Sequence, residues 1–117
     1  MRLHHLALRT HDIERTASFY RDAIGLREMA RKLDDHGALR SIWLEADGVV
    51  IMVERRADGE AGVSPMSMEL VAFSIDRAMR EEFRSRLAPI EAETEFTLYA
   101  RDPDGRRVAV SCYAFER

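Results

Sequence analysis

The sequence predicts an α+β fold made of two copies of one unit, each with the order strand, helix, three strands. Apolar and polar residues alternate with period two in the strand segments, and apolar residues recur at helical spacing in two others. Laying residues 6–8 over residues 71–73 places His5 over Leu70, at an offset of 65 residues. The matching order of elements and this alignment together indicate an internal repeat.

The first strand and the first helix are defined by a cap and a stop signal. A strand is expected over residues 3–9, and a helix over residues 13–24. The short carboxylate of Asp12 can accept the unpaired amides of the first helical turn. Gly25 fits the left-handed position at which helices end, so the chain is expected to leave the helix there.

The remaining strands of the first half contain a strong hairpin signal. Asp47 and Gly48 separate a strand over residues 40–45 from a β-branched run over residues 49–53. The strand expected before them, over residues 26–33, has a weaker pattern. The sequence therefore predicts an antiparallel pair of strands with a less distinct strand before it.

The repeated order starts again after a polar segment. The first module is expected at about residues 1–56, a linker at about 57–67 and the second module at about 68–117. Within the second module, the strand over residues 68–75 is followed by Asp76 as a helix cap. Apolar residues at spacings of four then predict the second helix, which is blocked at Pro89. The helix is expected over residues 78–87.

The chain is expected to end in a hairpin. Strands over residues 95–101 and 108–113 flank the sequence Asp102-Pro103-Asp104-Gly105. Proline presets the first turn angle and glycine tolerates a positive φ, so this segment predicts a tight turn.

Length, composition and charge exclude several classes of protein. The chain has 117 residues, of which 46% are hydrophobic and 33% are charged, a mixture that can bury one core. A net charge of -3 gives no general attraction for nucleic acid, and no apolar run is long enough to span a membrane. Cys112 is the only cysteine, so no intrachain disulfide is expected. We therefore expect a soluble, cytoplasmic protein that binds neither nucleic acid nor membrane.

Three segments, in order and at matching spacing, resemble the vicinal oxygen chelate superfamily, the group of glyoxalases, bleomycin resistance proteins and extradiol dioxygenases. The segments are residues 5–26, 71–76 and 102–108. The resemblance implies a fold of class α+β, in which two βαβββ modules form a curved, cup-shaped mixed sheet with helices on the convex face. It also implies a ligand site in the concave face, and a homodimer.

The resemblance also implies where a metal would be bound. Metal-dependent members take ligands from the first and last strands of each module, and these positions fall on His5, Leu70, Met52 and Ala109. Only His5 has a suitable donor atom, because leucine and alanine have none and a thioether suits a hard cation poorly. A register slip of two residues on the fourth strand would replace Met52 with Glu54. We therefore expect no metal and no cofactor.

Seven residues are expected to line the ligand site, and some of them have a purely structural alternative. Tyr99 stands where related fosfomycin-resistance enzymes place a tyrosine against substrate, and it could equally be an ordinary strand residue. Trp43 could stack on a flat ligand or fill the core. Arg9 and Arg107 share the inward parity and would suit a carboxylate or a phosphate. The ligand-binding candidates are His5, Trp43, Met52, Leu70, Tyr99, Ala109 and Tyr113.

The function expected from these residues is binding or sequestration of a small organic molecule, such as an antibiotic or a metabolite, without a metal. This function is what the resemblance implies. The residues themselves indicate only that most of the implied metal ligands are missing. The alternative is an enzyme, a glyoxalase-related lyase, isomerase or dioxygenase, with an incomplete or partner-completed metal site. Its catalytic candidates are His5, as a general base, and Glu54. A scaffold or regulatory subunit with a residual pocket is a third hypothesis.

Overall fold

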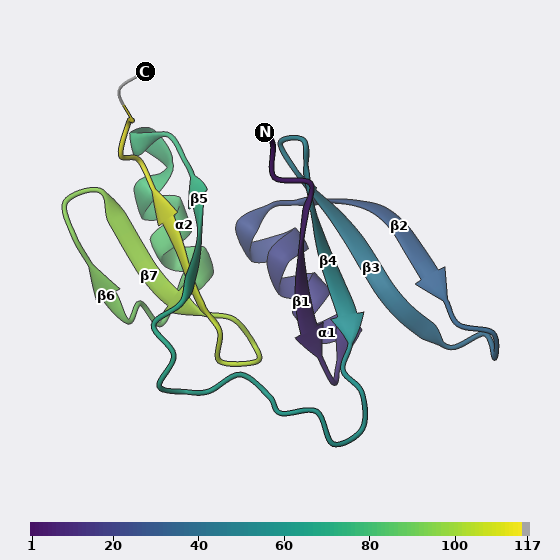
Figure 1. Cartoon of the computed structure of the whole chain (residues 1–117). Coiled ribbons are helices and arrows are strands. Elements are labelled where there is room, and N and C mark those ends of the chain that lie inside the picture. Colours follow the sequence, from purple (N-terminus) through teal and green to yellow (C-terminus); the bar gives the residue numbers. More distant parts are fainter. Residues whose placement is uncertain (116–117) are drawn as a thin grey trace. The chain divides into compact units, whose positions relative to one another are not determined.

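Each half of the chain forms a four-stranded mixed sheet with helical segments on one side, as the internal repeat predicts (Figure 1). The computed structural model describes residues 1–115. These residues divide into two units, the first spanning Met1–Gly62 and the second beginning at Val63. The prediction of an α+β fold with two βαβββ modules is confirmed, although the strands form two separate sheets and not one continuous sheet.

The first unit contains four strands and one helical segment. Its strands are β1 (His5–Thr10), β2 (Arg27–Leu33), β3 (Leu39–Ala46) and β4 (Val49–Arg55). They are arranged in the order β1-β4-β3-β2, with β1 parallel to β4 and the other neighbours antiparallel. The predicted hairpin at Asp47 and Gly48 joins β3 to β4, and both residues have positive φ.

The helical segment of the first unit begins and ends where the sequence predicts, but its second half has a wider turn. Helix α1 (Ile13–Ser18) is capped by Asp12, whose carboxylate accepts the amide of Arg15 at 3.1 Å. It continues as a π-helical segment, η1 (Phe19–Ile24), and ends at Gly25 with φ of 98°. The apolar residues of this segment face the sheet, and the buried ones are Ile13, Ala17, Tyr20 and Ile24.

The second unit repeats this topology with shorter strands. Its strands are β5 (Leu70–Ser74), β6 (Ala92–Glu93), β7 (Thr97–Arg101) and β8 (Arg107–Ser111), in the order β5-β8-β7-β6. The helix α2 (Arg80–Leu87) follows a short 3₁₀ turn, η2 (Arg77–Met79). Asp76 precedes this turn as predicted, but its side chain makes no capping hydrogen bond. Instead, its carbonyl oxygen accepts the amide of Met79 at 2.9 Å.

Each sheet has one face against its helical segment and one open face. In Figure 1 the helical segment of each unit lies behind its sheet, so the open face is toward the viewer. The parity of β1 illustrates the division, because Leu8 and Thr10 are buried while His5 and Arg9 are exposed. None of the helices in residues 1–115 has the length and apolar character needed to cross a membrane.

Candidate functional site

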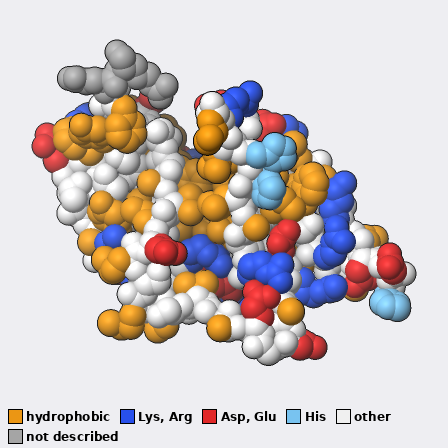
Figure 2. All heavy atoms as spheres, viewed as in Figure 1, with side chains coloured by type: hydrophobic (Ala, Val, Ile, Leu, Met, Phe, Trp, Pro, Cys, Tyr) orange, Lys and Arg blue, Asp and Glu red, His pale blue; other side chains and the backbone are white. Residues whose placement is uncertain are grey.

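The open face of the second sheet is hollowed by a cavity of about 370 Å³. Three of the residues expected to bind ligand, Leu70, Tyr99 and Tyr113, line this cavity together. In Figure 2 hydrophobic side chains are prominent on this face of the second unit. No charged side chain lines the cavity among the described residues, and the other lining residues are Ala72, Phe73, Ser74, Thr97, Ser111 and Phe115.

The strand register explains why these side chains lie together. Ala72 of β5 pairs with Ala109 of β8, and Tyr99 of β7 pairs with the same Ala109. All three therefore share the open face at one level of the sheet. Ala109, the fourth predicted residue of this unit, is buried and lies beneath this part of the face. Its small methyl group leaves room beside Tyr99.

Hydroxyl groups and aromatic rings form the part of the cavity wall that contains Thr97, Ser111, Tyr113 and Phe115. Thr97 and Ser111 share a hydrogen bond of 2.9 Å between their hydroxyl oxygens. The ring of Tyr113 is held edge to face between Phe96, at 5.4 Å, and Phe115, at 5.3 Å between centroids. This wall is apolar with a few hydroxyls, which is the composition expected of a site for a small organic molecule.

The open face of the first sheet carries the other predicted residues, but it does not bring them all together. His5 lies at the level of Val50, whereas Glu54 lies at the level of Arg9. The two are thus separated by four residues along neighbouring strands, about 13 Å at the usual rise. Met52 of β4 lies opposite Ala7 of β1, two residues before Glu54 along the same strand.

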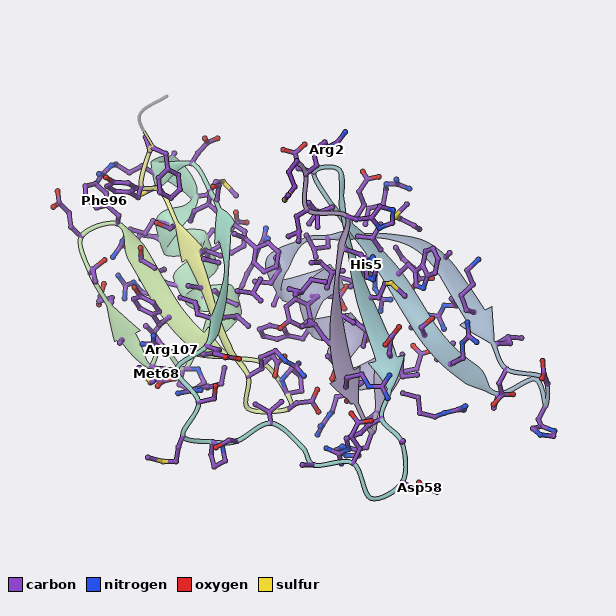
Figure 3. All side chains as sticks on the ribbon, in the orientation of Figure 1. Arg2, His5, Asp58, Met68, Phe96 and Arg107 are labelled. Atoms are coloured by element: carbon purple, nitrogen blue, oxygen red, sulfur yellow. The ribbon has the colours of Figure 1, made fainter. Side chains whose placement is uncertain are left out.

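His5 contacts its neighbour in the chain and not an acidic residue. Its Nδ1 atom lies 2.9 Å from Nδ1 of His4, and the two rings meet edge to face. Both imidazoles are exposed, and Figure 3 shows His5 on β1. A neutral histidine with one protonated nitrogen can share a proton with its neighbour in this geometry.

Trp43 lies half-buried on the open face of the first sheet. It pairs with Met52 across the strands, and its indole nitrogen donates to the Ser41 hydroxyl at 3.1 Å. The Lys32 ammonium lies 4.8 Å from the centroid of its ring. The distance is that of a cation–π contact.

Ion pairs organise the end of this face that contains Arg9. Its guanidinium donates to Glu54 at 3.1 Å and to both oxygens of Glu60, at 2.7 Å and 3.1 Å. Glu60 also accepts the amide of Ala57 at 3.1 Å. A second cavity, of about 360 Å³, lies here and has a strongly charged lining that includes Met52 and Glu54.

The Arg9 ion pair predicts an unusual titration of Glu60. The hydrogen bond from Arg9, followed by that from the Ala57 amide, lowers the pKa of Glu60 to about 2 from the usual value near 4.5. The stabilisation linked to this shift is therefore present above pH 4.5 and is lost as the pH falls through about 2. Carbon-detected NMR of the Glu60 carboxyl group should give this midpoint.

Arg9→Gln should return the Glu60 midpoint most of the way toward 4.5, because Arg9 is the largest cause of the shift. Arg40→Gln is the control, since Arg40 lines the same cavity but is not among the causes of the shift. A Glu60 midpoint that stays low in Arg9→Gln would contradict the assignment.

The sequence analysis missed several lining residues. Thr97 and Phe115 share the period-two parity of Tyr99 and Tyr113, so the alternation could have identified them. Glu60 falls in the segment expected to be a linker, and its bonds to Arg9 span 51 positions of sequence. No local pattern indicates such a contact.

Comparison with known families gives a match over most of the chain. The profile of the Glyoxalase/Bleomycin resistance protein/Dioxygenase superfamily matches residues 2–110. The chain belongs to this superfamily. The resemblance seen in the sequence is thereby confirmed, and no curated protein matches the chain.

Solved structures of the superfamily share the fold at low sequence identity. Lactoylglutathione lyase from Agrobacterium tumefaciens is 20% identical, with a TM-score of 0.70 over 94% of this chain and 92% of that one. A glyoxalase/dioxygenase from Nostoc punctiforme is 18% identical, with a TM-score of 0.77 over 97% and 92% of the two chains. A mutant of the fosfomycin resistance protein FosX from Listeria monocytogenes is 18% identical, with a TM-score of 0.79 over 97% and 93%.

The FosX structure overturns the expectation that no cofactor is involved. It holds Mn(II) together with 1S,2S-dihydroxypropylphosphonic acid. The expectation was wrong because it was drawn from the small number of donor atoms at the implied ligand positions, which does not exclude a metal that a substrate or another chain helps to hold.

The potential donor side chains in the described part of this chain do not form a metal site by themselves. Residues 1–115 contain no group of three or more His, Cys, Asp or Glu side chains placed to hold an ion. Leu70 and Ala109, at two of the implied positions, have no donor atom. These side chains do not by themselves fit a metal.

Proposed function

We propose that this member of the superfamily binds a small organic molecule on the open face of its second sheet. The observation that carries the proposal is the cavity of about 370 Å³, lined by aliphatic, aromatic and hydroxyl side chains. A cavity of this size, mainly apolar and with few polar groups, is typical of small-molecule sites. The structural neighbours support it, because the FosX structure contains a small organic phosphonic acid.

A screen of metabolites and antibiotics by thermal shift and NMR tests this proposal. A ligand present at 100 times its dissociation constant should stabilise the fold by about 2.7 kcal/mol. Its binding should shift the amide signals of the residues around the cavity, with Leu70, Ala72 and Tyr99 as reporters. Ligands that shift only signals of β1 to β4, or a broad screen without a ligand, would contradict the proposal.

A second candidate, a metal-assisted lyase or dioxygenase, is favoured by the Mn(II) of the FosX structure and by the lactoylglutathione lyase neighbour. In this chain His5, an exposed imidazole on β1, would be its first donor. Elemental analysis of protein purified without an affinity tag separates the two candidates. Stoichiometric metal would favour the enzyme.

We also propose that the protein forms a homodimer. Large apolar side chains of the second unit are exposed to solvent, and contiguous exposed apolar surface is typical of protein interfaces. The most exposed of them are Met66, Met68, Leu70, Tyr113 and Phe115. Sedimentation velocity would report the mass of the assembly.

A further inference from the structure

One arginine beside the cavity of the second sheet has a side-chain nitrogen without a hydrogen-bond partner among residues 1–115. Arg107 opens β8 and pairs in register with Leu70 of β5 and Arg101 of β7, which places it on the open face. Its Nε atom is buried and makes no hydrogen bond. A buried donor without a partner is rare in folded proteins and commonly marks a place where water, an ion or a ligand binds.

Packing fixes where this guanidinium lies. Its central carbon stacks 4.2 Å from the centroid of the Tyr99 ring, and Tyr99 is part of the cavity wall. Leu70, the register partner of Arg107 on β5, is part of the same wall. Arg107 is therefore at one end of the cavity, and Figure 3 shows it at the start of β8, with Phe96 at the opposite end of the sheet.

The nearby acidic group is already engaged. Glu91 accepts two hydrogen bonds from Arg101, at 2.5 Å and 2.8 Å, and Arg101 also donates to two carbonyl oxygens. The bond from Arg101 is the main cause that lowers the pKa of Glu91, and the charge of Arg107 adds a smaller effect. Arg101 is thus engaged by Glu91, whereas the Nε atom of Arg107 has no partner among residues 1–115.

The cavity itself offers no competing negative charge, because no Asp or Glu is among its lining residues. A guanidinium presents two parallel N–H groups that match the two oxygens of a carboxylate. A single positive charge at the end of a neutral, largely apolar cavity is complementary to a monoanion with an apolar body.

We propose that Arg107 recognises the carboxylate of a small organic acid whose apolar body lies along Leu70 and Tyr99 in this cavity. The proposal rests on the proposed function and adds the chemical class of the ligand. Arg107 acts here as a binding residue that selects acids over neutral molecules of the same shape.

The test compares an acid with its neutral isostere. The probes are 4-phenylbutyrate and 4-phenylbutyramide, which differ in charge and share their apolar body. Dissociation constants come from NMR titrations of the full chain at pH 7. We expect the acid to bind wild-type protein at least about tenfold more tightly than the amide, the low end for a charged hydrogen bond.

Arg107→Met keeps an unbranched apolar stem and removes the charged guanidinium, so this variant should bind the acid and the amide equally. Arg77→Met is the matched control, because Arg77 also stacks on an aromatic ring of the second unit, that of Phe96 at 5.5 Å. The control should keep the wild-type preference for the acid. Dispersed amide spectra of both variants establish that they remain folded.

The outcomes separate the two proposals. Equal binding of both probes to wild-type protein, or a preference for the acid that survives in Arg107→Met, overturns the role of Arg107 and leaves the cavity as a binding site. Shifts confined to the first sheet overturn the cavity itself. Failure of both probes to bind at millimolar concentration overturns the assignment of an organic acid as ligand, while the broader screen still decides the cavity.

Discussion

Replacing Asp102 with alanine is expected to lower the free energy of unfolding by about 3 kcal/mol, the usual loss for breaking a buried ion pair. The Asp102 carboxylate is fully buried and organises the turn between β7 and β8. It accepts the amides of Asp104 and Arg106 at 2.9 Å and 3.0 Å, and the Arg106 guanidinium at 2.5 Å. Alanine leaves these donors without an acceptor in a poorly solvated place.

Chemical denaturation monitored by circular dichroism measures this loss. Asp34→Ala is the matched control, because Asp34 makes the same pattern of bonds in the turn between β2 and β3. It accepts the amides of His36 and Ala38 and the guanidinium of Arg55. Its side chain is 20% exposed, against 0% for Asp102, so water can replace its bonds and the loss should be smaller. An equal loss in both variants would refute the argument from burial.

Ala72→Trp should abolish ligand binding in the cavity of the second sheet. Ala72 is exposed on the open face, where an indole ring would fill the space beside Tyr99. For 4-phenylbutyrate, or for any molecule found in the screen, we expect binding weaker by more than about a hundredfold, which corresponds to about 2.7 kcal/mol. Stability should change little, because tryptophan is well tolerated at exposed strand positions. Isothermal titration calorimetry measures the affinity.

The duplicated topology supplies a control for this variant. Ala7 pairs with Met52 on the first sheet as Ala72 pairs with Ala109 on the second. Ala7→Trp therefore places the same ring at the equivalent position of the other unit, and it should leave binding unchanged. Binding within threefold of wild type in Ala72→Trp, or loss of binding in Ala7→Trp, would rule out the cavity of the second sheet as the site.

Much of the fold could be predicted because it depends on local rules. The parity of β1 assigned His5 and Arg9 to the open face, and the alternation extends to Tyr99. Asp12 and Gly25 fixed the ends of the first helical segment, because capping and left-handed backbone each require particular side chains.

Other features depend on contacts that no local pattern reveals. The π-helical turn arises where the Tyr20 carbonyl accepts both the Gly25 and the Leu26 amides, an arrangement that spacing alone does not distinguish from an α-helix. Strand β6 is only two residues long and pairs with Leu98 and Tyr99. So short a strand is defined by its partner and not by its own alternation.

The candidate site was predicted in part for the same reason. Parity placed Leu70, Tyr99 and Tyr113 on one face, and all three line one cavity. Their role in binding a ligand stays a prediction. Parity could not establish that the Nε atom of Arg107 has no hydrogen-bond partner among the described residues, or that Arg9 pairs with Glu54 and Glu60. Glu60 belongs to a loop that is far from Arg9 in the sequence. Whether an arginine has a hydrogen-bond partner depends on residues that are close in space but distant in sequence.

The two halves show how a duplicated backbone can diverge. Their sheets have the same strand order, yet one open face is covered by paired charges around Arg9 and the other is neutral around Tyr99. Side chains at equivalent places in the two copies have therefore specialised separately while the scaffold stayed the same. Substitutions on the open face of one sheet can therefore change its ligand specificity while the other sheet keeps its own side chains.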